Sequence, residues 1–250
     1  MPGFMKRLYK VMDEADIIVE VLDARFPKET TNRIIEEFAT RNKKTLIRAL
    51  NKSDLVSKKF LIKATKMFEK TIIISAKERT GINILKKTIK KGAKEQNKVA
   101  FVGYPNTGKS SLINAISGRK SAPTSIKAGF TRGEQFIRIS KEIMLIDSPG
   151  IISYGEMDEA ELALLGAKGF EQIKDIERCA EHIATYIINA NPKVLSSKYN
   201  LTKTKEADEV LEDIAKEKCF LLKGGKPDVK RASRLVLEEW QKGKLNVFKN

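Results

Sequence analysis

The chain is poor in the residues on which disulfide frameworks and metal centres depend. Its 250 residues include two cysteines and one histidine. Cys179 and Cys219 lack metal-ligand spacing, and we expect both to be reduced, buried, hydrophobic side chains. His182 lies in a helical pattern far from any motif, so we expect a structural role. A disulfide scaffold and a His/Cys metal site are therefore disfavoured.

Long apolar runs are also missing. No run reaches the roughly 18 residues that a membrane span needs, and the first ten residues lack the apolar core of a secretory signal. Lipidation motifs, a long amphipathic anchor, internal repeats and low-complexity segments are absent as well. We expect a soluble, cytoplasmic protein that does not act on a membrane.

Acidic residues are scarce in the first part of the chain. Residues 1–155 have 15 Asp and Glu against 31 Lys and Arg, whereas residues 156–250 have 17 of each. Within the second part, residues 156–215 carry a net charge of −6 and residues 216–250 a net charge of +6. This asymmetry indicates a polyanionic partner, most simply nucleic acid. A charge-rich surface of a heat-adapted protein is the alternative, but it would balance the two signs.

The pattern of the first 150 residues predicts an α/β domain. Five apolar runs, rich in Val, Ile and Leu, indicate strands: 17–23, 44–50, 71–75, 98–103 and 142–147. Helical periodicity occupies 31–40, 58–70 and 81–95 between them. Alternation of this kind predicts a doubly wound, mostly parallel sheet, which binds ligands at the carboxyl ends of its strands.

The pattern changes after Gly150. Helical periodicity without a convincing strand covers about 158–168, 174–190, 205–219 and 229–242, with turn-rich interruptions at NANPK and KGGKP. We predict two domains, an α/β domain over 1–154 and a small all-α domain over 155–250.

A phosphate-binding loop follows the fourth predicted strand. GYPNTGKS, residues 103–110, matches G-x-x-x-x-G-K-[ST] in the required place between strand and helix. Its glycines let backbone N–H groups approach phosphate oxygens, Lys109 supplies a positive charge, and the Ser110 hydroxyl can ligate Mg²⁺. We expect the nucleotide to contact Asn106, Thr107, Gly108, Lys109, Ser110 and Ser111.

Two further segments suit the phosphate end of the same ligand. DSPG, residues 147–150, ends the fifth predicted strand; Asp147 suits Mg²⁺ and the Gly150 N–H suits the γ-phosphate. Thr131 lies between this segment and the loop, and we expect it to ligate Mg²⁺, with an ordinary loop threonine as the alternative. Lys109, Thr131 and Gly150 are the expected catalytic residues.

The base is read by motifs that come earlier in the chain. NKSD, residues 51–54, follows the second predicted strand, and SAK, residues 75–77, ends the third. The Asp54 carboxylate can accept from both guanine donors, Asn51 suits the other purine edge, and the Lys52 stem can lie along the base. The backbone of Ser75 and Ala76, with Lys77 beside it, can reach the guanine oxygen. Adenine lacks that donor pair, so the motifs select GTP and GDP.

These motifs run base, base, phosphate, switch, magnesium, whereas the usual order starts with the phosphate loop. Because the termini of compact α/β domains often lie close together, joining them and opening another loop preserves the site. The fold class we predict is therefore a P-loop NTPase-type, mostly parallel α/β sheet, circularly permuted, followed by a small all-α domain.

With DARFP at residues 23–27, this order resembles the circularly permuted GTPases of the RbgA/YlqF family. The resemblance covers essentially the whole chain, and KGGKPDVKRASRLVLEEWQKGKL (223–245) is similar to the C-terminal signature of archaeal and nucleolar members. It implies a GTPase that assists large ribosomal subunit assembly. In that segment Leu235, Leu237 and Trp240 are expected to dock inward. The expected RNA-binding residues are Lys223, Lys226, Lys230, Arg231 and Arg234, with a solvated helix face as the alternative.

Two departures from related GTPases bear on catalysis. Phe4 stands where many bacterial members carry a histidine, and Ile151 follows Gly150 where Ras-like switches carry a water-orienting glutamine. The resemblance to other GTPases with a hydrophobic residue at this place implies that Asn106 holds a potassium ion. A simple turn residue is the competing interpretation.

The expected function is a slow GTPase, stimulated by its partner, that binds large-subunit rRNA and pre-ribosomal particles and uses Mg²⁺. No binding to DNA is expected. Two alternatives stay open: an RNA-binding module whose GTP site only stabilises the fold, and a GTPase that acts on a different RNA.

Overall fold

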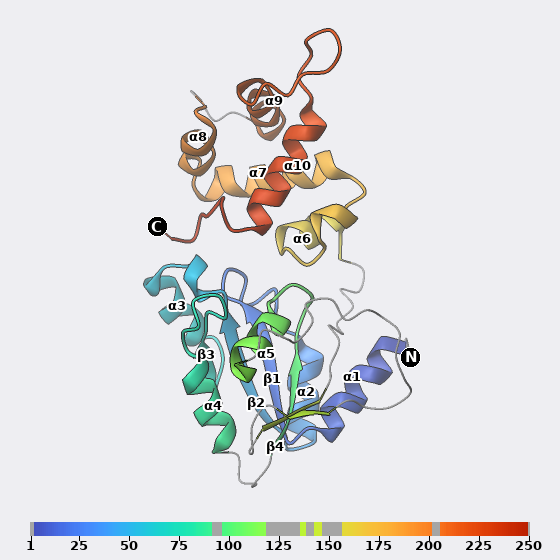
Figure 1. Cartoon of the computed structure of the whole chain (residues 1–250), viewed down its shortest axis with the longest axis vertical. Helices are drawn as coiled ribbons and strands as arrows, with labels where there is room; N and C mark the ends of the chain where they lie inside the picture. Colours follow the sequence, from blue (N-terminus) through green and yellow to red (C-terminus); the bar gives the residue numbers. More distant parts are fainter. Residues whose placement is uncertain are drawn as a thin grey trace. The chain divides into compact units, whose positions relative to one another are not determined.

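The computed structural model describes residues 3–91, 97–118, 136–138, 143–146, 157–201 and 206–249. The chain divides into two compact units, Met1–Ser153 and Tyr154–Asn250. The first unit is a sheet covered by helices, and the second is a set of packed helices (Figure 1).

The first unit contains a six-stranded sheet in the order β3-β2-β1-β4-β6-β5. Five strands are parallel to their neighbours, and β5 pairs antiparallel with β6 at one edge. The predicted α/β fold with a mostly parallel sheet is thus confirmed. The strands are β1 Ile17–Asp23, β2 Thr45–Asn51, β3 Thr71–Ile73, β4 Asn97–Val102, β5 Phe136–Arg138 and β6 Ile143–Ile146.

Helices cover both faces of this sheet, which explains the continuous apolar runs of its strands. All seven residues of β1 are buried. Ile17, Val19 and Val21 pack in one core cluster with residues of α4 and α5, whereas Ile18 packs in a second cluster with residues of α1 and α2. The helices of this unit are α1 Gly3–Glu14, α2 Arg33–Arg41, α3 Lys58–Thr65, α4 Ile82–Lys90 and α5 Lys109–Ser117.

In its described residues, the second unit contains helices and an isolated bridge between Leu221 and Pro227, with no strand. Its helices are α6 Glu159–Leu164, α7 Ile176–Ala190, α8 Lys193–Tyr199, α9 Ala207–Glu217 and α10 Val229–Gln241. Two 3₁₀ turns, Ser53–Leu55 and Phe170–Gln172, complete the elements of the two units. In the described part of the chain, no helix is long and apolar enough to cross a membrane.

Trp240 is a central core residue of the second unit. It is 1% exposed, and its indole N–H donates to the carbonyl of Leu164 at 2.7 Å. The ring of Tyr186 meets it edge-on, with centroids 5.8 Å apart. Leu237 is buried as expected, but Leu235 is half-exposed, because the neighbouring Val236 takes the inward position on α10.

The two cysteines have different surroundings. Cys179 is buried on the apolar face of α7, as expected, whereas Cys219 is exposed, so the expected burial of Cys219 is wrong. Cys219 lies just beyond α9 with a left-handed backbone, φ 54°, where the chain turns away from the apolar face of that helix. His182 lies 3.3 Å from Glu161, at the surface of the second unit.

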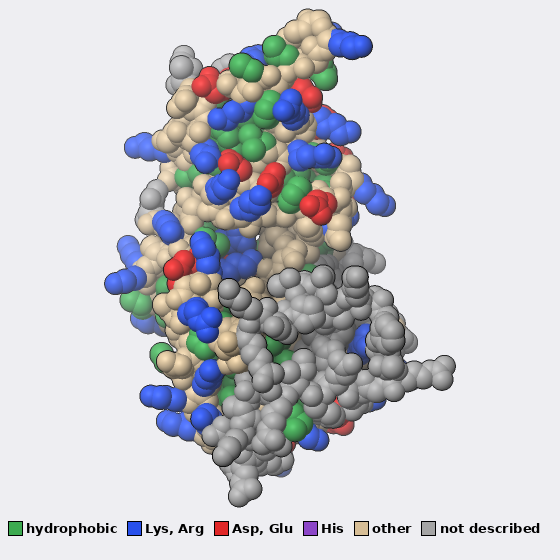
Figure 2. Space-filling model, viewed as in Figure 1, with side chains coloured by type: hydrophobic (Ala, Val, Ile, Leu, Met, Phe, Trp, Pro, Cys, Tyr) green, Lys and Arg blue, Asp and Glu red, His purple; other side chains and the backbone are tan. Residues whose placement is uncertain are grey.

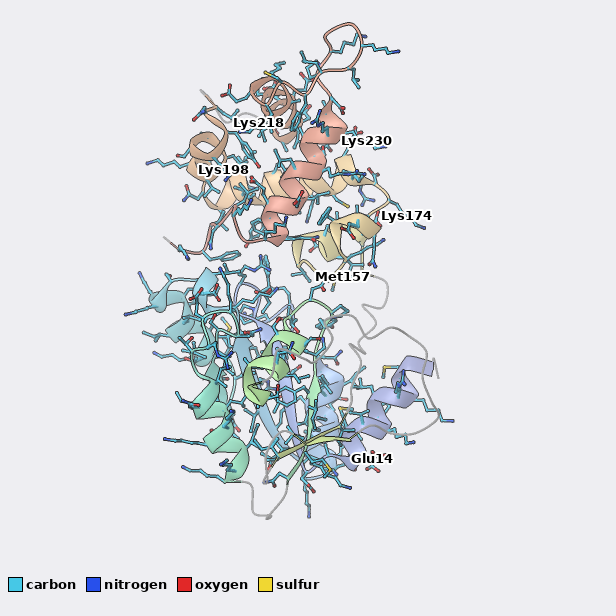
Figure 3. The ribbon with its side chains drawn as sticks, in the orientation of Figure 1. Glu14, Met157, Lys174, Lys198, Lys218 and Lys230 are labelled. Carbon is cyan, nitrogen blue, oxygen red and sulfur yellow. The ribbon has the colours of Figure 1, made fainter. Side chains whose placement is uncertain are left out.

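A buried hydrogen bond ties α8 to α10. Tyr199 is 1% exposed, and its hydroxyl donates to Glu239 Oε2 at 2.8 Å. Burial raises the pKa of Tyr199, as does the Glu239 carboxylate, so the hydroxyl keeps its proton. Lys198 Nζ lies 3.6 Å from the same carboxylate, with its side chain 39% exposed (Figure 3).

We expect Tyr199→Phe to lower the free energy of unfolding of the second unit by about 1–3 kcal/mol, because a buried carboxylate loses its donor. Urea titrations followed by fluorescence of the sole tryptophan, Trp240, measure this loss. The control Lys198→Met removes a half-exposed ion pair and should cost less than about 1 kcal/mol. Equal losses of unfolding free energy in the two variants would show that the Tyr199 hydroxyl contributes no more than the ion pair.

Candidate nucleotide site

The loop between β4 and α5 is closely packed against the sheet and requires its glycines. Gly103 has φ 142° and Gly108 φ 92°. A Cβ on Gly103 would stand 2.5 Å from the Val21 carbonyl oxygen, and one on Gly108 would stand 2.3 Å from the side-chain nitrogen of Asn51. Gly108 also caps α5, and it offers no side-chain oxygen to the first N–H groups of that helix. Phosphate oxygens suit those donors.

A cavity of about 450 Å³ opens at this loop, within the range of small-ligand sites. It brings together residues from the predicted phosphate loop and from the predicted base-reading motif. Lys52, Pro105, Asn106, Gly108, Lys109, Ser110 and Ser111 line it. Pro105 is the one lining residue that the sequence analysis did not assign to the site.

Lys109 is folded back onto its own loop. Its ammonium donates to the carbonyl oxygens of Gly103 at 2.9 Å and Tyr104 at 2.5 Å, and the residue is 8% exposed. Burial, with a smaller contribution from the charge of Lys52, lowers the pKa of Lys109 to about 7. An anionic phosphate in the cavity is a better partner for this group than two neutral carbonyls.

Asn51 joins three loops. Its side-chain nitrogen donates to the Thr107 carbonyl at 2.9 Å, and its side-chain oxygen accepts from the Ala76 N–H at 3.0 Å. Both polar groups of Asn51 bind the protein, and the expected contact of Asn51 with an edge of the purine stays a prediction. The residue is 2% exposed, and a buried amide needs partners for its donor and its acceptor.

The N–H groups of Ser75 and Ala76 have partners within the protein. Ser75 N–H donates to the Thr80 carbonyl at 3.2 Å, and Ala76 N–H donates to the side-chain oxygen of Asn51. An antiparallel bridge between Ser75 and Thr80 closes the loop. The contact of this loop with the guanine oxygen stays a prediction. Lys77, the third residue of the motif, is exposed beside Glu78 at 3.8 Å.

The Ser75 side chain orients the carboxylate of Asp54, the residue predicted to bind the base. Its hydroxyl donates to Asp54 Oδ1 at 2.6 Å and accepts from the Glu78 N–H at 3.0 Å. Asp54 lies in the 3₁₀ turn Ser53–Leu55 and is half-buried. A carboxylate has about four acceptor positions, so this contact sets its direction and leaves capacity for a ligand with two donors.

Two residues of DARFP join the site, and the sequence analysis gave them no role. Asp23 ends β1 beside Asn51, and its carboxylate accepts from the Arg25 guanidinium at 3.0 and 2.8 Å. Its Oδ2 also lies 2.8 Å from Lys52 Nζ. Burial raises the pKa of Asp23, but Arg25 and Lys52 outweigh burial and hold it well below its usual range. Asp23 therefore fixes Lys52 at the cavity wall, and its place at a strand end beside NKSD is the signal that marks it.

The remaining predicted site residues divide into two groups. Thr107 is buried through its bond to Asn51, whereas Asn106, Ser110 and Ser111 are exposed at the cavity. Asn106 has a left-handed backbone, φ 59°, which favours asparagine and supports a turn role. Thr131, Asp147 and Gly150 lie outside the described residues.

Residues that suit Mg²⁺ are present in part. Ser110 places a hydroxyl at the cavity beside Lys109, and hydroxyl oxygens are hard ligands that suit Mg²⁺. Among the residues that the structure describes, no cluster of three His, Cys, Asp or Glu side chains forms a ready-made metal site. The available donor therefore fits an ion that is held jointly by protein and phosphate rather than by a protein cage.

Comparisons with known proteins agree with this geometry. The model of the 50S ribosome-binding GTPase family matches residues 98–223, and the RsgA GTPase model matches residues 5–156. A GTP-binding protein of Methanocaldococcus jannaschii is 39% identical over 98% of this chain and 66% of its own length. Nucleolar GTP-binding protein 2 of Saccharomyces cerevisiae is 34% identical over 96% of this chain, which spans 52% of that relative. The crystal structure of GNP-bound YlqF from T. maritima has a TM-score of 0.70 and 26% identity, covering 98% of this chain and 96% of the other.

We expect Asn51→Ala to reduce the free energy of unfolding by about 2–5 kcal/mol, because two buried backbone groups lose their partners. Guanine-nucleotide affinity should fall by about tenfold or more, since the phosphate and base loops are no longer tied together. Thermal unfolding and titration with a fluorescent GTP analogue measure the two effects.

Asn97→Ala is the matched control for this variant. Asn97 is also buried, and its side chain donates to the Ile89 carbonyl at 3.3 Å, at the other end of the sheet. It should destabilise the protein without changing nucleotide affinity. If both variants weaken nucleotide binding to the same extent, the Asn51 effect is one of general stability.

Proposed function

This chain belongs to the family of circularly permuted GTPases, and on that premise we propose that it is a GTP-hydrolysing switch that binds rRNA and assists large ribosomal subunit assembly. The family accounts for GTP and GDP as ligands. The ribosomal role extends from the name of the matching 50S ribosome-binding GTPase family and from the nucleolar relative in yeast, of which this chain spans 52%.

The observation that carries the nucleotide part is the Asn51 bridge. It brings the loop that bears Lys52 and Asp54 against the loop that bears Lys109, so Lys52 and Lys109 line one cavity, and Asp54 lies two residues beyond Lys52 on the same loop. When Lys109 leaves its two carbonyl partners for the β- and γ-phosphates, the negative charge gains a buried cation. Ser110, with Asp147 and Thr131 as further proposed ligands, would hold Mg²⁺, which would supply positive charge to the phosphate oxygens.

The RNA part is supported by the charge of the last 35 residues and by its exposure. All five proposed contacts, Lys223, Lys226, Lys230, Arg231 and Arg234, are exposed. Lys230 lies near the start of α10 (Figure 3). The Arg231 guanidinium lies 4.2 Å from the ring centroid of Phe220, which holds it in place without a carboxylate. Phosphate contacts of this kind position a protein on RNA.

Two alternatives differ from this proposal in how GTP hydrolysis responds to RNA and to large-subunit particles. If the GTP site only stabilises the fold, hydrolysis has no dependence on RNA; if another RNA is the target, large-subunit particles do not stimulate it. For the compartment, the cytoplasm remains a prediction, since the yeast relative is named as a nucleolar protein.

We expect Asp54→Asn to lower GTP affinity by about one to three orders of magnitude, because an amide replaces half of the acceptor capacity with a donor. Xanthosine triphosphate, which offers the complementary pattern, should bind the variant better than the wild type. Competition titrations with GTP, ATP and xanthosine triphosphate measure the change. An unaltered preference for GTP over ATP in the variant would refute the assignment of Asp54.

We expect the isolated protein to hydrolyse GTP slowly, since Ile151 cannot orient water and Phe4 offers no base. Purified large ribosomal subunits should accelerate phosphate release, with small subunits as the control. Potassium should exceed sodium as an activator if Asn106 holds the ion, and Asn106→Ala removes this difference. A fast rate that depends on neither particles nor potassium would overturn the proposed switch.

A further inference from the structure

We propose that exposed lysines on α3 and α4 of the first unit form a second binding surface for RNA phosphates. This inference rests on the proposed function. The α3–α4 lysine face consists of six exposed residues: Lys58, Lys59, Lys63 and Lys66 from α3 and its cap, with Lys87 and Lys91 from the end of α4. Lys and Arg side chains crowd the edge of the first unit at which Figure 1 draws these helices (Figure 2).

Carboxylates are scarce in this part of the chain. Residues 55–91 include 11 Lys and Arg but only two acidic residues, Glu69 and Glu78. Glu78 lies 3.8 Å from Lys77, outside the face. Within the described ranges, none of the six lysines of the face forms an ion pair. A surface adapted for stability would pair such charges, so this excess indicates an external anion.

The position of Lys58 and Lys59 opposes helix stability. The first turn of α3 holds both lysines and no acidic residue, although the positive end of a helix dipole favours acids there. α2, α7 and α9 follow the stabilising rule, with Glu36, Glu177 and Asp208 in their first turns.

Among the helices of the described residues, α10 is the only other one with two cations and no acid in its first turn. These cations are Lys230 and Arg231, which are already proposed to contact RNA. The N-cap Asp228 compensates there by accepting from the Arg231 N–H at 3.0 Å, whereas the N-cap of α3 is Ser57 and supplies no such acid. Since paired cations also begin the helix of the proposed RNA surface, we assign the same ligand to the α3–α4 lysine face.

The apolar residues of this face argue for RNA rather than for a membrane. Ile62, Met67 and Ile84 are 58%, 37% and 59% exposed. On α3 itself, Leu61 and Ala64 are buried and Phe60 is half-buried, so Ile62 is the only exposed apolar side chain of this helix. An interfacial helix needs a continuous apolar face turned outward, and α3 does not have one.

The face is also attached to the nucleotide site. α3 begins three residues after the 3₁₀ turn that bears Asp54, and its N-cap Ser57 accepts from the Phe60 N–H at 3.4 Å. α4 begins after the loop of Ser75 and Ala76. Rigid elements that start at the base-reading loops therefore hold the lysines in place.

The test is a fourfold variant, Lys58→Gln, Lys59→Gln, Lys63→Gln and Lys66→Gln, which keeps good helix formers throughout. Its affinity for purified large-subunit rRNA should fall about tenfold or more at physiological salt. The slope of log K against log salt concentration should fall by about 0.7 for each lost phosphate contact. GTP affinity should not change, because these lysines lie outside the cavity.

The matched control removes four other exposed cations of the same unit: Lys6→Gln, Arg7→Gln, Lys28→Gln and Lys43→Gln. It changes the net charge equally and should retain rRNA binding. Equal losses of rRNA affinity in the two variants would refute the assignment of the α3–α4 lysine face, because net charge alone would then explain the binding. Retained rRNA binding by the Lys58/Lys59/Lys63/Lys66 variant overturns the face and leaves the proposed function intact.

Two further outcomes complete the test. Wild-type protein that does not bind rRNA at all overturns both the proposed function and this inference. If the variant instead loses binding to vesicles that contain phosphatidylserine while its rRNA binding is unchanged, the face binds membranes and the proposal is overturned.

Discussion

Asn51 stands at the carboxyl end of β2, where its amide donates to the Thr107 carbonyl at 2.9 Å and accepts from the Ala76 N–H at 3.0 Å. These partners are 56 and 25 residues away along the chain. The contact depends on strands that end at the same edge of a parallel sheet, and the order in which the chain visits them is irrelevant to it. A permuted chain can thus keep the nucleotide site, provided that β2 still ends beside β1 and the phosphate loop.

The cations of this edge have different partners, and the difference decides what each can do. Asp23 pairs with Arg25 and Lys52, so both are fixed before a ligand arrives. Lys109 donates to two carbonyls, and burial lowers its pKa to about 7. The pKa of Asp23 is depressed, so its contribution to stability is present above its unfolded pKa and is lost as the pH falls through the folded value. Arg25 and Lys52 are thus already paired with a carboxylate, whereas Lys109 has only neutral partners and would gain the most binding energy from a phosphate.

Apolar runs were sufficient to predict β1, β2, β3, β4 and β6, because a sheet covered on both faces needs nearly continuous Val, Ile and Leu. β5 was not predicted, because its three residues, Phe136–Arg138, end in a charged side chain and do not belong to a longer apolar run like the one around β3. α1 and α8 were also missed. α8 starts directly after Pro192, which ended the predicted helix but also suits the start of the next one.

The site shows the same limit at the level of single bonds. Residue types at strand ends indicated a guanine nucleotide. The two hydrogen-bond partners of the Asn51 side chain, however, are backbone groups, which have no sequence signature. Asp23 could be seen in DARFP, yet its pairing with Lys52 depends on the register of β1 with β2, which sets Asp23 opposite Asn51. Periodicity predicts faces and strand ends; it does not predict register.

Contacts within the protein fix the positions of the side chains that we propose to bind the nucleotide. Ser75 binds Asp54, Asp23 binds Lys52, and Asn51 binds Thr107, so contacts within the protein hold the loops that we propose to bind the base and the phosphates. Side chains that are ordered during folding lose little further entropy when a ligand binds. We propose that the Asp54 carboxylate, whose direction Ser75 sets, distinguishes guanine from adenine. A ligand without the two donors would leave part of the acceptor capacity of that carboxylate unused on desolvation, and this penalty would add to the selectivity.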